Sequence, residues 1–201
     1  MKVIISAGHS KLDQGTSFGP FKENELTIRV RDEFKRLYTG EALYPPDNLT
    51  LKETIDWINN WLTIDKNALA VEIHFNSHKD DSVRGTEVYY FGTPRYAAIF
   101  AQKISEVIGI PNRGSKPDSM SYVGELGFLR KLNCPSVLVE ICYLTNRADR
   151  DMLEVNGITS IAKGMINAIN ILTIEELKTK QINLLQKILL VLQDKLKKLL
   201  G

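Results

Sequence analysis

Residues 71–78, VEIHFNSH, place two of the chain's three histidines in and just after an otherwise apolar segment. Side chains alternate across a strand, so Glu72, His74 and Asn76 share one face while apolar residues share the other. His74 and Asn76 also lie at the carboxyl end of the segment. In open α/β sheets, binding sites form beyond the carboxyl ends of the strands. The segment therefore predicts both a buried strand and a site at its end.

Apolar segments that read as strands alternate along the chain with helical patterns. The strands are predicted at 2–7, 69–75, 86–91 and 137–144. Three of these are nearly continuous in aliphatic residues, as expected for strands covered on both faces. The alternation predicts an α/β domain with a largely parallel twisted sheet flanked by helices.

Helix signals lie between and after these strands. Leu26, Val30, Phe34 and Leu37 form an apolar stripe at helix spacing, and Thr50 and Glu53 form a capping box at the start of a second helix. Thr93-Pro94 predicts the start of a third helix, which Gly109 is expected to end. Asn146 is expected to cap a short helix that extends to about Val155. A further helix is predicted at 158–172.

Composition narrows the class of protein. A length of 201 residues fits one domain with an appendage, and a net charge of +2 without any nucleic-acid motif argues against a nucleic-acid partner. Two cysteines do not form a disulfide framework. The N-terminus lacks the length and cleavage site of a signal peptide, and no apolar run reaches membrane-spanning length. We therefore expect synthesis in the cytoplasm.

A second histidine reaches the same edge of the predicted sheet, because His9 follows the first strand after Gly8. A lone strand histidine is more often a satisfied core residue, but two at neighbouring strand ends can converge on one metal ion. A catalytic zinc takes three protein ligands, so the third would be a carboxylate. Glu23 is the best candidate and Glu25 the alternative; either can also be a helix-start acid favoured by the dipole. His78 is predicted to be a surface residue.

Glu140 is the one charged residue of the strand segment SVLVEICYL. Burial there disfavours the carboxylate and raises its pKa, which suits general acid–base work near a metal. The structural alternative is a buried glutamate paired with arginine or lysine.

Together these motifs resemble the zinc-dependent N-acetylmuramoyl-L-alanine amidases of the Amidase_3 family, found in bacterial cell-wall hydrolases and phage endolysins. The matching motifs are ISAGHS, FKENELT, VEIHFNS and FLRKLNCPSVLVEICYLTN, in this order over residues 1–172. GTEVYYF and IGIPNRGSK are similar to the phage members.

The resemblance implies one Zn²⁺ per chain, held by His9, Glu23 and His74, with Glu140 as general acid and base. It implies hydrolysis of peptidoglycan at the amide between N-acetylmuramic acid and the L-alanine of the stem peptide. An endolysin acting on the host cell wall is the implied role. Asn76, Asn112 and Arg113 are expected to bind substrate, although Arg113 can equally be a solvated loop residue.

Other functions remain open at this point. A zinc carboxypeptidase or endopeptidase acting on stem peptides also uses two histidines and a glutamate. A non-catalytic peptidoglycan-binding module with the same fold is the alternative from a different class.

The C-terminal segment differs from the rest of the chain. We expect a catalytic domain at 1–172 and a long amphipathic helix at 173–201, where six lysines accompany three acidic residues. Leucines and isoleucines recur at heptad spacing within 182–199. The helix is predicted to pack on the domain, to form a homo-oligomer, or to contact a membrane.

Overall fold

The computed structural model describes residues 1–9, 13–64 and 67–200. Ser10 of the ISAGHS motif and Gly201 of the predicted C-terminal helix lie outside the described residues. The strands are β1 (Lys2–Ala7), β2 (Ser17–Phe18), β3 (Phe21–Lys22), β4 (Ala42–Leu43), β5 (Ala68–Asn76), β6 (Thr86–Tyr90), β7 (Asn112–Pro117) and β8 (Ser136–Tyr143). The α-helices are α1 (Glu23–Leu37), α2 (Leu51–Leu62), α3 (Pro94–Ile108), α4 (Gly127–Lys131), α5 (Arg147–Met152) and α6 (Ile158–Leu200). A 3₁₀ turn, η1 (Asp118–Met120), and a π-helical turn, η2 (Leu153–Gly157), complete the described elements.

The described strands form a central six-stranded sheet in the order β4-β1-β5-β8-β6-β7, beside a small β2–β3 hairpin. Neighbours in the sheet are parallel except for β6 and β8, which are antiparallel. The expected α/β fold with a largely parallel sheet is confirmed. Because β6 and β7 run against the other strands, their amino-terminal ends lie at the carboxyl edge of β5 and β8.

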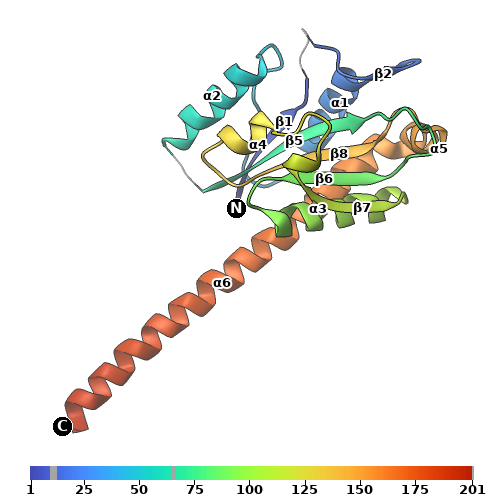
Figure 1. The fold of residues 1–201 in the computed structure, drawn as a ribbon. Helices are drawn as coiled ribbons and strands as arrows, with labels where there is room; N and C mark the ends of the chain where they lie inside the picture. Colours follow the sequence, from blue (N-terminus) through green and yellow to red (C-terminus); the bar gives the residue numbers. More distant parts are fainter. Residues whose placement is uncertain (10–12, 65–66, 201) are drawn as a thin grey trace.

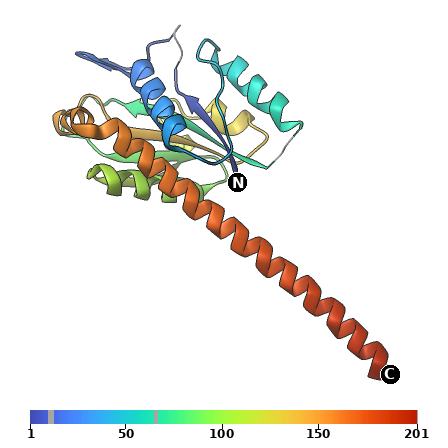
Figure 2. The same cartoon turned by 180° about the vertical axis from the view of Figure 1, so that it is seen from behind.

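Helices cover the two faces of this sheet unequally (Figures 1 and 2). On one face, α1, α3 and the first part of α6 pack a large apolar core that includes Phe34, Phe75 and Phe100. On the other face, α2 and α4 cover a smaller cluster around Ile58 and Phe128. Buried aliphatic residues on both faces explain why the central strands read as continuous apolar runs.

The expected helix ends are largely confirmed. Thr50 and Glu53 form the capping box of α2, and Gly109 ends α3 in the left-handed conformation with φ of 71°. Asn146 caps α5 by accepting a hydrogen bond from the backbone N–H of Asp149. Thr93 precedes α3 as expected, but its hydroxyl donates to the carbonyl of Ser136 instead of capping.

Some sequence expectations were wrong. Residues 112–117, NRGSKP, contain glycine and proline and no apolar run, yet they form β7 at the edge of the sheet, where such residues are tolerated. The short helix after Asn146 ends at Met152, and a π-helical turn leads into α6.

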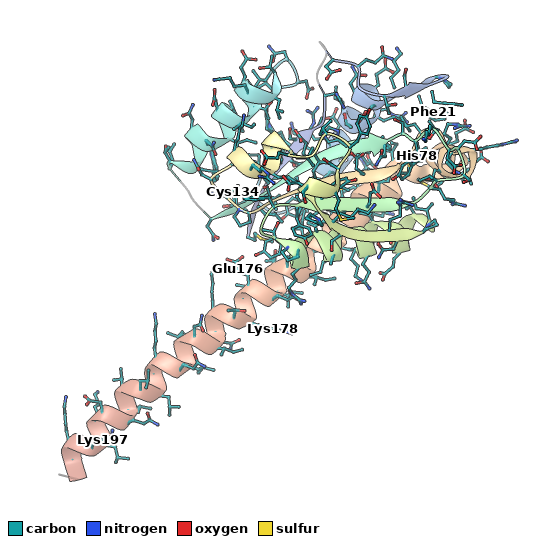
Figure 3. The ribbon with its side chains drawn as sticks, in the orientation of Figure 1. Phe21, His78, Cys134, Glu176, Lys178 and Lys197 are labelled. Atoms are coloured by element: carbon teal, nitrogen blue, oxygen red, sulfur yellow. The ribbon has the colours of Figure 1, made fainter. Side chains whose placement is uncertain are left out.

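The predicted helices at 158–172 and 173–201 are one continuous helix, α6, as far as Leu200. Ile161, Met165 and Leu172 are buried against the body, whereas residues 177–199 are exposed throughout. This exposed part, which we call the arm, extends away from the body, and Lys178 and Lys197 point outward from it (Figure 3). Among the described residues, no single helix has the length and apolar character needed to cross a membrane.

Candidate metal centre

Three side chains from different elements meet at the carboxyl edge of the sheet. His9 follows β1, Glu23 begins α1 and His74 lies near the end of β5. One potential ligand atom from each lies within 4.8 Å of the other two, and the two imidazole centroids are 5.0 Å apart. Two ring nitrogens and a carboxylate are a common zinc donor set with a fourth position free for water or substrate. The residues present therefore fit a zinc ion.

Glu23 lies at the centre of this cluster, and both its oxygens have partners. Oε1 is 3.0 Å from Nδ1 of His74 and accepts a hydrogen bond from the Phe75 backbone N–H at 3.0 Å. Oε2 is 3.2 Å from Nε2 of His9 and accepts from the Thr16 backbone N–H at 2.8 Å. Burial acts to raise the pKa of Glu23, but its hydrogen bonds with His74 and His9 outweigh burial and lower the pKa well below the usual range. Glu23 is therefore ionised.

A second carboxylate faces the other ring nitrogen of each histidine. Nδ1 of His9 is 2.8 Å from Asp13, and Nε2 of His74 is 3.3 Å from Glu72. Burial acts to lower both histidine pKa values, but the hydrogen bonds with Glu23 and with these carboxylates raise them above the ordinary value. Such outer carboxylates fix the ring orientation of metal-binding histidines. They leave Nε2 of His9 and Nδ1 of His74 facing Glu23.

Glu140 on β8 is directly opposite His74 of β5 in the sheet register. Its Oε2 is buried and has no hydrogen-bond partner among the described residues, which argues against a glutamate kept only for a structural ion pair. Burial raises the pKa of Glu140 to about 7; His74 opposes this rise, and Glu23 and Glu87 add to it. A carboxyl group that is partly ionised near neutral pH can both accept and return a proton.

Glu87 on β6 continues this row, because it is opposite Glu140 on the other side of β8. It is 2% exposed and accepts hydrogen bonds from Asn76 at 3.1 Å and from Arg113 at 2.7 Å. Asn76 and Arg113, two of the three residues expected to bind substrate, therefore both donate hydrogen bonds to this buried carboxylate. The third, Asn112, is exposed, and its side chain accepts a hydrogen bond from the Gly114 backbone N–H.

A cavity of about 410 Å³ opens from the cluster into the gap between α2 and α4. His9, Glu72 and His74 form its polar end, and Leu51, Leu126, Phe128 and Leu138 are among the residues of its apolar end. The cluster is therefore reachable by a solute, and the cavity offers an apolar surface next to it.

The backbone around the cluster is tightly constrained. His9 adopts the left-handed conformation at φ of 59°, which is uncommon for a residue with a side chain and clusters at functional sites. Gly15 has φ of +65°, and a Cβ there would lie 2.5 Å from Oε2 of Glu23 and 2.6 Å from the His9 ring. We expect Gly15→Ala to lower zinc affinity about tenfold or more, because the methyl group displaces Glu23 or His9. Competition with a chromophoric chelator measures this affinity.

Gly19→Ala is the matched control, because Gly19 has φ of +58° and nothing lies within 4 Å of its added Cβ. It carries the same backbone strain without the clash. Equal loss of zinc affinity in both variants would contradict the role given to Gly15.

A family model described as N-acetylmuramoyl-L-alanine amidase, Amidase_3, matches residues 3–171. The chain belongs to the Amidase_3 family. The match includes His9, Glu23, His74 and Glu140, and it ends inside α6 before the arm begins.

Proteins and solved structures named as amidases resemble the chain at low sequence identity. The protein named "Probable cell wall amidase LytH" of Staphylococcus saprophyticus is 25% identical over 157 residues, which cover 75% of this chain and 50% of LytH. The chain spans about half the length of the first curated relatives it matches. The crystal structure of N-acetylmuramoyl-L-alanine amidase from Clostridium difficile 630 has a TM-score of 0.72 at 20% identity, covering 84% of this chain and 94% of that one. The catalytic domain of the CD27L endolysin targeting Clostridia difficile has a TM-score of 0.62 at 25% identity, covering 85% and 97%.

Within this Amidase_3 chain, the structure separates the two carboxylates that the sequence left open. Glu23 is buried in the cluster, whereas Glu25 is exposed and forms an ion pair with Lys22. His78 is exposed, as expected, and its Nδ1 accepts a hydrogen bond from the Asp80 backbone N–H.

Sequence reasoning missed Asp13, Glu72 and Glu87 as parts of the site. Glu72 could have been found from strand alternation, because it lies two residues before His74 on the same face. Glu87 was visible as a charged residue inside the apolar segment GTEVYYF. Asp13 offered no such signal, because it lies outside the predicted strands and helices.

Proposed function

We propose that the chain is a zinc-dependent N-acetylmuramoyl-L-alanine amidase that cuts the amide between N-acetylmuramic acid and the L-alanine of the stem peptide. The observation that carries this proposal is the register of β5 with β8, which sets Glu140 beside His74 and hence beside the cluster. Membership of the Amidase_3 family supports it.

In this proposal His9, Glu23 and His74 hold one zinc ion per chain. The ion, when bound, polarises the scissile carbonyl and makes water a better nucleophile at neutral pH. Asp13 and Glu72 orient the two histidine rings. Glu140, opposite His74 in the sheet, accepts a proton from the attacking water and returns it to the leaving amine of L-alanine. Asn76, Asn112 and Arg113 contribute to substrate binding.

The products of digestion test this proposal. We expect purified peptidoglycan to yield stem peptides with a free L-alanine amino terminus and glycans that keep their lactyl carboxyl groups, identified by mass spectrometry. Cleavage inside the stem peptide would instead assign a zinc endopeptidase or carboxypeptidase. Binding to peptidoglycan without any release would assign a non-catalytic module.

We further propose that the enzyme acts on the cell wall as an endolysin. The fold similarity to the CD27L endolysin catalytic domain and the relative named as a cell wall amidase support this role. The division into a catalytic domain at 1–172 and a C-terminal helix at 173–201 remains a prediction, and so does contact of residues 182–199 with a second copy or a membrane. Exposure of large apolar side chains such as Leu185, Leu189 and Leu192 along the arm supports such a contact.

A further inference from the structure

A row of ionisable side chains crosses four neighbouring strands on the face covered by α2 and α4. His74 on β5 is opposite Glu140 on β8, and Glu140 is opposite Glu87 on β6. Arg113 and Lys116, from the edge strand β7, close the row at Glu87. Strands lie about 4.8 Å apart, and the cationic groups reach Glu87 on β6, so they lie roughly one strand spacing beyond Glu140 on β8. The row leads from the proposed cluster to a pair of cations.

Glu87 holds this pair in place. Arg113 Nε donates to Oε2 of Glu87 at 2.7 Å, and Lys116 Nζ donates to the same oxygen at 2.6 Å. Tyr89 and Asn76 donate to the other oxygen at 2.9 and 3.1 Å. Four donors hold the orientation of this buried carboxylate, and the carboxylate in turn holds the two cations.

Arg113 and Lys116 carry two positive charges, whereas Glu87 carries one negative charge. One cation neutralises Glu87, so the charge of the second is left for Glu140, which lies opposite Glu87, or for a carboxylate of a solute. The side chain of Lys116 is 22% exposed and that of Arg113 is 32% exposed, whereas Glu87 is 2% exposed. Each cation donates to Glu87 through one nitrogen atom, while an ammonium has three N–H donors and a guanidinium five. Each partly exposed cation therefore has N–H donors beyond the one that Glu87 accepts, although the guanidinium of Arg113 also lies over the ring of Tyr143 at 5.2 Å.

We propose that Arg113 and Lys116 form a carboxylate-binding subsite that selects stem peptides with a free carboxylate close to the scissile amide. This inference rests on the proposed amidase function. An extended peptide spans about 3.3–3.6 Å per residue, so a distance of roughly 5–8 Å corresponds to a carboxylate on the second residue. A stem peptide whose second residue is an acidic amino acid can carry such a carboxylate, and amidation removes it. Charge-assisted hydrogen bonds to a carboxylate are about twice as strong as neutral ones, and the amide forfeits this gain.

The test compares two stem tripeptides with lysine as third residue and an amidated C-terminus that differ only at the second residue, where one has a free α-carboxylate and the other its amide. Titration calorimetry of the zinc-loaded full chain with each peptide measures Kd without turnover. We expect the carboxylate peptide to bind about tenfold tighter than the amide. Lys116→Met is expected to abolish this preference by weakening only the carboxylate peptide, and Lys116→Arg is expected to retain it. Arg113 still pairs with Glu87 in both variants, so the fold should persist.

Lys103→Met is the matched control. Lys103 is also an ion-paired lysine, with Glu106, and its side chain is 25% exposed, but it lies on α3 at the opposite face of the sheet. It should retain the full preference. Equal affinity of the wild-type chain for both peptides, or an unchanged preference in Lys116→Met, would overturn the subsite. Because binding is read without turnover, a chain that prefers the carboxylate peptide but releases no L-alanine amino termini from peptidoglycan contradicts the amidase proposal and leaves the subsite standing.

Discussion

Glu140→Gln is expected to lower kcat/KM on purified peptidoglycan by about 10²–10⁴-fold while zinc content and fold stay unchanged. Glutamine keeps the size of the side chain but cannot accept the proton of the attacking water. Glu140 is not one of the three side chains of the cluster, so its loss should leave zinc stoichiometry near one per chain. Release of amino termini gives the rate, and elemental analysis gives the zinc content.

The same variant has a second, opposite effect on stability in the metal-free protein. The pKa of Glu140 is raised from an ordinary value of 4.5 to about 7 by burial. A carboxyl group with a raised folded-state pKa favours the folded state at low pH, and this contribution is lost as pH rises through about 7. At pH 8 the metal-free Glu140→Gln chain should therefore be more stable than wild type, by a few kcal/mol at most. Near-wild-type activity together with unchanged stability at pH 8 would contradict the role of Glu140.

Glu23→Gln is expected to abolish stoichiometric zinc binding and, with it, hydrolysis. The substitution removes the negative charge that both histidines face, at 3.0 and 3.2 Å, and puts an amide N–H₂ group against donors that need an acceptor. Metal affinity of such sites depends on anionic or neutral deprotonated ligands. Chelation of the wild-type chain should have the same effect on activity, and added zinc should restore wild type but not the variant.

Glu25→Gln controls for the loss of a helix-start charge, because Glu25 lies two residues later in the first turn of α1 but is exposed. It should bind zinc like wild type. A Glu25→Gln chain that loses zinc, beside a Glu23→Gln chain that keeps it, would reverse the assignment of the third ligand.

Much of the fold was predictable because local signals agree with the tertiary structure. The strands β1, β5, β6 and β8 are apolar enough to be recognised, and Thr50, Gly109 and Asn146 mark helix ends by their own chemistry. The direction of β6 was not predicted, although the connection between β5 and β6, residues 77–85, holds no helix and is shorter than parallel crossovers usually are.

The cluster itself was also largely predictable, since His9 and His74 lie at the carboxyl ends of adjacent parallel strands. The choice between Glu23 and Glu25 was not, because helix rotation decides which of them faces the sheet edge. The pair Arg113 and Lys116 depends on β7, a strand whose glycine and proline conceal it in the sequence. Only the pairing of β7 with β6 brings the two cations to Glu87.

An anomalous difference map collected at the zinc edge from crystals of the full chain tests the central claim most directly. We predict a single strong peak about 2.0–2.2 Å from a ring nitrogen of His9, a carboxylate oxygen of Glu23 and a ring nitrogen of His74, with Glu140 beside it and outside the ligand set. A map without a peak among these three side chains, or with the ion bound elsewhere in the chain, would contradict the account.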